Sequence, residues 1–81
     1  MDQTITNKIC EMTAMVMKNN ERLKPNRYQT ISVDDCSIIC IEAERTGEKP
    51  KVIWFECATF GSIYFDKSFD RLYNLIKGVE S

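Results

Sequence analysis

Four cysteines are the first candidates for chemistry in this chain of 81 residues. Cys10 lies in a segment of helical periodicity and Cys57 near the end of a predicted strand. Cys36 and Cys40 lie on one predicted strand, where their Cα atoms would be about 13 Å apart at ~3.3 Å per residue, too far for one tetrahedral ion. The chain has no histidine and no Cys-x-x-Cys pair, so a zinc site would need every cysteine. We therefore expect free thiols that behave as small apolar side chains, with no metal and no cofactor; a metal site and a disulfide are the alternatives.

Carboxylates are the second group that could act chemically. Without histidine, the commonest general base is missing, and neither a Cys–His nor a Ser–His–Asp system can be assembled. Glu42 and Glu44 share one face of a predicted strand, and with Asp34, Asp35 and Glu56 they could hold magnesium for phosphodiester cleavage. The other interpretation is that such acids are solvated strand ends or protect a sheet edge. We predict that the chain is not an enzyme and keep a metal-dependent hydrolase as one alternative.

Basic and aromatic residues raise the question of nucleic-acid binding. The basic residues form two groups, Lys18, Arg22, Lys24 and Arg27, then Arg45, Lys49 and Lys51. The aromatic residues that could stack bases are Trp54, Phe55, Phe60, Tyr64 and Phe65. Because 11 basic residues face 12 acidic ones, the net charge is −1, without the positive surplus that phosphates call for. Single-stranded nucleic-acid binding is therefore the second alternative, and an aromatic core with solubilising lysines is the simpler explanation.

The first element that positions these residues is a helix predicted over residues 4–23. Its buried stripe consists of Ile5, Ile9, Met12, Val16 and Leu23, which fall together at 100° per residue. Cys10, Ala14 and Met17 form a second apolar stripe on roughly the opposite side. This stripe is either tolerated exposure of small or flexible residues, or a contact face for a partner or a second copy. The Lys24-Pro25-Asn26 segment is expected to end the helix.

The middle of the chain, residues 28–66, predicts an antiparallel sheet. Residues 28–33 alternate, and residues 36–45 contain the run Ile38–Ile41, which is apolar on both faces and indicates a central strand. The segment 46–50 is a hairpin connector, and residues 51–57 return with Val52–Phe55. Gly61 interrupts the stretch 60–66. Residues 51–66 form either one bent strand or two.

A closing helix is predicted over residues 67–79, with the buried stripe Phe69, Leu72, Ile76 and Val79. The fold class is therefore α+β: an N-terminal helix, an antiparallel sheet of three or four strands, and a C-terminal helix, all in one domain spanning residues 1–81. A sheet with two apolar faces needs two covers. Either each helix covers one face, or both helices cover one face and a second subunit covers the other.

The order of elements resembles two groups of proteins. It is similar to part of the roadblock-type dimerisation fold, although that family's opening strand pair is absent; the resemblance implies a homodimer built by the sheet and one helix. The layout is also similar to small phage-encoded inhibitors of host defence, including anti-CRISPR proteins. Both likenesses concern the arrangement of elements alone.

The sequence thus predicts a small non-enzymatic protein-binding module, an inhibitor or a dimeric adaptor. A chain this short buries only about 60–65% of its unfolded surface, so some large apolar side chains should remain accessible. The expected contact residues are Cys10, Ala14, Met17, Trp54, Phe60 and Tyr64. The expected partner is another protein, such as a larger host complex, or a second copy. With no signal-peptide pattern and no apolar run of membrane-spanning length, we expect a cytoplasmic protein that does not enter the membrane.

Overall fold

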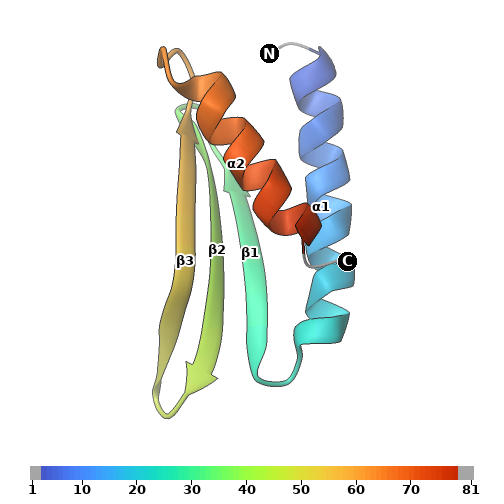
Figure 1. Cartoon of the computed structure of the whole chain (residues 1–81), viewed down its shortest axis with the longest axis vertical. Helices are drawn as coiled ribbons and strands as arrows, with labels where there is room; N and C mark the ends of the chain where they lie inside the picture. The colour runs from blue at the N-terminus through green and yellow to red at the C-terminus, as the bar shows by residue number, and fades with distance from the viewer. Residues whose placement is uncertain (1–2, 79–81) are drawn as a thin grey trace.

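The computed structural model describes residues 3–78 and has the predicted α+β architecture. Its elements are α1 (Gln3–Leu23), β1 (Arg27–Val33), β2 (Ser37–Thr46), β3 (Lys49–Thr59) and α2 (Phe65–Gly78) (Figure 1). The strands form one antiparallel sheet in the order β1-β2-β3. The central position of β2 confirms the inference from its run of apolar residues.

Both helices pack on the same face of the sheet. Met12 and Val16 of α1 and Leu72 and Ile76 of α2 belong to one buried cluster. From the sheet, that cluster includes Ile38, Cys40 and Ala58, which the strand register places on one face. The helix stripes predicted from the sequence therefore meet over a single side of the sheet, and Figure 1 shows the two ribbons together on that side. Val79, the last member of the predicted α2 stripe, lies outside the described residues.

The stretch 60–66 is not a strand. The third strand ends at Thr59, a turn follows, and α2 begins at Phe65, two residues earlier than the sequence indicated. Gly61 has a φ of 83°, a left-handed conformation that other residues rarely adopt, so the chain reverses there instead of extending the sheet. Phe65 then stacks on Phe60, with ring centroids 5.3 Å apart, and fixes the turn against the core. The possible fourth strand is thereby replaced by a turn.

Two irregularities interrupt β3. The register shifts between the pairs Glu42–Trp54 and Ala43–Val52, so that Ile53 is an extra residue in β3, a β-bulge. Pro50, at the start of the strand, pairs with Arg45 of β2. The N–H of Arg45 points toward β1 and donates to the carbonyl oxygen of Asn26 at 2.7 Å, so the backbone nitrogen of its partner Pro50 points away from β2. Pro50 therefore lacks an N–H on the outer edge of the sheet, where proline is tolerated.

Candidate binding surface

The face of the sheet that no helix covers is the main candidate for a binding surface. We call it the open sheet face, and the register places on it Tyr28, Thr30, Ser32, Ser37, Ile39, Ile41, Ala43, Arg45, Pro50, Val52, Phe55, Cys57 and Thr59. Phe55 and Val52 are 54% and 55% exposed, and neither isoleucine belongs to the buried core or to the apolar residues packed against it. Phe55 and Val52 thus lie largely against solvent, whereas Ile39 and Ile41 are half-buried and Ala43 is buried.

Arg45 is the only charged side chain that the register places on this face, among residues 3–78. It lies at the end next to the β2–β3 hairpin, with its guanidinium 4.6 Å from the centre of the Tyr28 ring. Its Nη1 donates to the carbonyl oxygen of Pro25 at 3.0 Å. Tyr28, Arg45 and the hairpin residues 46–50 line a shallow groove of about 300 Å³. The middle of the face is neutral and largely apolar.

The opposite end of the open sheet face is acidic. The turn between β1 and β2 carries Asp34 and Asp35, both exposed. The Asp34 carboxylate accepts the N–H groups of Cys36 and Ser37 at 2.7 Å each, and these bonds lower the pKa of Asp34 below its usual value. The face therefore has a negative end at this turn and a positive end at Arg45.

The six contact residues predicted from the sequence lie in three different places. Cys10, Ala14 and Met17 are exposed on the outer side of α1, where Met17 keeps 69% of its surface. Trp54 shares the helix-covered side of the sheet with Glu42, and both Trp54 and Phe60 pack against the core while remaining half-buried. Tyr64 is 66% exposed in the turn before α2. The structure thus puts exposed apolar area on α1 and at Tyr64.

None of the residues on the open sheet face was among the predicted contact residues, although the sequence indicated that this face is apolar. The runs Ile38–Ile41 and Val52–Phe55 are apolar on both faces. With both helices on one side, the outward half of each run has no cover. Trp54 was predicted as a contact residue because of its residue type. The strand register instead directs Trp54 to the helix-covered side of the sheet and Phe55 to the open sheet face.

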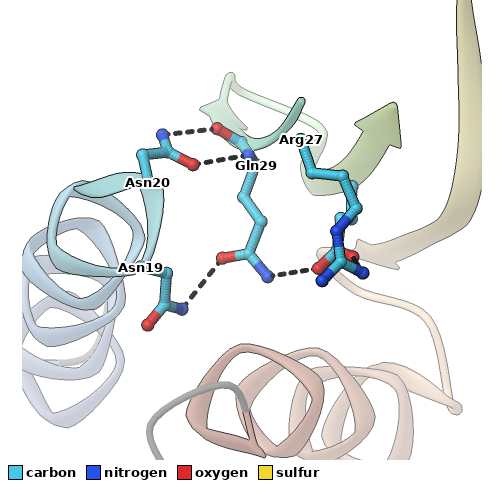
Figure 2. Close-up of polar contacts among 5 residues, drawn as sticks. Asn19, Asn20, Arg27 and Gln29 are labelled. Atoms are coloured by element: carbon cyan, nitrogen blue, oxygen red, sulfur yellow. Dashed lines mark hydrogen bonds and ion pairs between the residues drawn. The ribbon is translucent and has the colours of Figure 1, made fainter. Parts of the chain in front are cut away.

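A buried polar network joins α1 to the sheet on the helix-covered side (Figure 2). Asn19 Nδ2 donates to Gln29 Oε1 and to the carbonyl oxygen of Ile76, each at 2.9 Å. Gln29 Nε2 donates to Glu42 Oε1 at 3.0 Å, and Arg27 Nη1 lies 3.3 Å from Glu42 Oε2. Asn19, Gln29 and Glu42 are all buried, and their hydrogen bonds link α1, α2 and the sheet, while Asn19 Oδ1 has no hydrogen-bond partner in the described part of the chain.

This network corrects the interpretation of Glu42 from the sequence. Glu42 is neither a solvated strand end nor an edge charge, because it is only 5% exposed on the central strand. Its two oxygens already engage Gln29 and Arg27. Within residues 3–78 no three side chains of the metal-ligating types gather at one point.

The cysteines are free thiols in four different settings. Cys10 and Cys36 are exposed, Cys57 is half-buried on the open sheet face, and Cys40 is buried in the core. Burial raises the pKa of the Cys40 thiol to about 12. Cys40 is therefore the thiol that behaves as a small buried apolar side chain, whereas Cys10, one of the predicted contact residues, is accessible.

Neither described helix is long and apolar enough to cross a membrane. Comparisons of this chain with protein-family models, with curated proteins and with solved structures found no match.

Proposed function

We propose that this protein is a small non-enzymatic protein-binding module that works through the open sheet face, as an inhibitor or a dimeric adaptor. The observation that supports this function is a sheet face whose middle is neutral and largely apolar, with Phe55 and Val52 more than half exposed. Apolar patches of this kind on small domains mark sites of protein contact. The free thiols suit a reducing compartment, and we place the protein in the cytoplasm. An inhibitor of a host defence complex is the specific form that the layout of the elements suggests.

Phe55 is the residue on which the test of this function should act. A lysine at position 55 would put a charge in the middle of the contact, while the side chain stays solvated in the free protein. Ile63 is 89% exposed in the turn before α2, so Ile63→Lys is a matched apolar-to-lysine control away from the sheet. Affinity capture from the native cell, followed by mass spectrometry, should recover the same partner with the wild type and Ile63→Lys and lose it with Phe55→Lys. Equal recovery by all three proteins would remove the open sheet face from the proposal.

One feature favours the alternative, single-stranded nucleic-acid binding. The groove beside Tyr28 combines an aromatic ring, the Arg45 guanidinium and Lys49, which could stack a base and neutralise a phosphate. Only this end of the face is basic, and its other end carries two aspartates. Titration with a labelled oligonucleotide at low salt tests the alternative. Binding that weakens with salt and with Arg45→Ala supports it, whereas a flat titration ends it.

A further inference from the structure

The charges at the two ends of the open sheet face restrict what can cover it. Ile41 lies near the middle of β2, four residues from Ser37 in one direction and four from Arg45 in the other. Each interval is about 13 Å along a strand. Ser37 touches the acidic turn directly, since its N–H donates to Asp34 Oδ1 at 2.7 Å. Arg45 and the start of the acidic turn therefore lie at about equal distances from Ile41 along β2, and the two ends of the face are opposite in charge.

We propose that the open sheet face binds a second copy of this chain, face to face, with the strands of the two sheets running in opposite directions. This inference rests on the proposed function and names the partner of that surface. A two-fold axis across the strands at Ile41 would place Arg45 of each copy above Ser37 and the acidic turn of the other. Each dimer would then contain two such charge pairs, because a two-fold interface repeats every contact.

The other ways of stacking two copies are worse electrostatically. A two-fold axis parallel to the strands would put Arg45 against Arg45 and the Asp34–Asp35 turn against itself. Like charges at close range disfavour that arrangement. The opposed arrangement instead gives a four-layer molecule of helices, sheet, sheet and helices, with the sheets about 10 Å apart. Ile39, Ile41 and Phe55 would form its central layer.

The same charges argue against nucleic acid over most of this face. A strand of phosphates lying along β2 would meet one guanidinium at Arg45 and two carboxylates at Asp34 and Asp35. The N–H groups of Cys36 and Ser37 lower the pKa of Asp34, which favours its charged form further. A partner that carries a positive charge at one end and a negative charge at the other suits this pattern. A second copy of the chain is such a partner.

Light scattering and sedimentation of the full-length chain, from about 1 µM to about 1 mM, test the association. We expect the wild type to shift from monomer to dimer within this range. Phe55→Lys and Val52→Lys should each raise the dissociation constant about ten-fold or more, while Ile63→Lys should leave it unchanged. Circular dichroism checks that each variant is folded. Association can also be measured without variants, by monitoring the amide NMR chemical shifts of the wild type as it is diluted. The residues whose shifts change should lie mainly on the open sheet face.

The orientation is tested by exchanging charges. Arg45→Glu alone and Asp35→Lys alone should each weaken the dimer by roughly five-fold at low salt, since each reverses both charge pairs. The double variant should recover most of the loss. A dimer that survives Phe55→Lys and Val52→Lys, or a double variant no tighter than the single ones, overturns the proposal.

A wild type that stays monomeric at 1 mM also overturns it. In that case the proposed function still stands if capture of a different protein depends on Phe55. If neither self-association nor capture depends on Phe55, both proposals fall.

Discussion

Asn20 closes the free edge of β1 at Gln29. Its Nδ2 donates to the Gln29 carbonyl oxygen at 3.0 Å, and its Oδ1 accepts the Gln29 N–H at 2.6 Å. One helical side chain thus makes the two hydrogen bonds that a neighbouring strand would make (Figure 2). The contact attaches the last turns of α1 to the sheet where no further strand is available.

Replacement of Asn20 by alanine should therefore destabilise the fold. The two hydrogen bonds are partly buried, so their loss should lower the free energy of unfolding by about 1–3 kcal/mol, despite the better helix propensity of alanine. Urea denaturation followed by circular dichroism measures this change. Asn7→Ala is the matched control, because Asn7 is exposed on the same helix and accepts one hydrogen bond, from Gln3. A smaller loss for Asn20→Ala than for Asn7→Ala would contradict the role of the edge contact.

Asn19→Ala should cost more than Asn20→Ala. Asn19 is fully buried, and its removal leaves Gln29 Oε1 and the Ile76 carbonyl oxygen without their donor. Unsatisfied buried acceptors together with a small cavity should lower the free energy of unfolding by about 2–4 kcal/mol. Denaturation midpoints, with unchanged slopes, would report it. Asn19→Leu restores the volume but not the hydrogen bonds, and stability equal to the wild type in that variant would show that the network is dispensable.

Asp34 should make stability depend on pH in acid. The N–H groups of Cys36 and Ser37 lower the pKa of Asp34 from its reference value of 3.8. A carboxyl whose pKa is lower in the folded state contributes stability that is present above the unfolded pKa and is lost as the pH falls through the folded pKa. Asp34→Asn should therefore be less stable than the wild type at neutral pH, and the difference should shrink below about pH 4. Asp35→Asn, which removes neither hydrogen bond, is the matched control in urea titrations from neutral pH into acid.

The four thiols should react at very different rates. At about pH 8 an alkylating reagent attacks thiolates that it can reach, so Cys10 and Cys36 should be labelled first. Cys40 should resist labelling in the folded protein, because it is buried and its pKa is raised to about 12. Mass spectrometry of digested samples gives the order, and labelling in urea should modify all four. Labelling of Cys40 at the rate of Cys36 would mean that the core opens far more readily than its packing implies.

The helices and the central strand could be predicted because their signals are periodic. Met12 and Val16 repeat at helical spacing, and Ile38–Ile41 marks a strand buried between two neighbours. The turn at residues 60–64 was missed because Phe60, Tyr64 and Phe65 have strand propensity, and Gly61 alone signalled the break. In this stretch, the helix that begins at Phe65 prevailed over local propensity.

The polar network and the open sheet face could be predicted less well. Asn19 follows Val16 by three residues and so belongs to the buried stripe of α1, but its polar type hid that role. Glu42 has the same parity as Ile38 and Cys40, which is the only sign in the sequence that it is buried. Which face the helices cover depends on contacts between distant elements, and periodicity within one strand carries no information about them.

Pro50 bears on how this protein avoids uncontrolled aggregation. A sheet with one exposed apolar face and an unpaired edge strand can pair with strands of other chains and grow into fibrils. Pro50, between Lys49 and Lys51, and the β-bulge at Ile53 make the first half of β3 a poor edge for pairing with another strand. Growth by edge addition is thereby discouraged, while the broad side of the sheet stays available. Pairing of two chains through this part of β3 should accordingly be disfavoured relative to contact through the open sheet face.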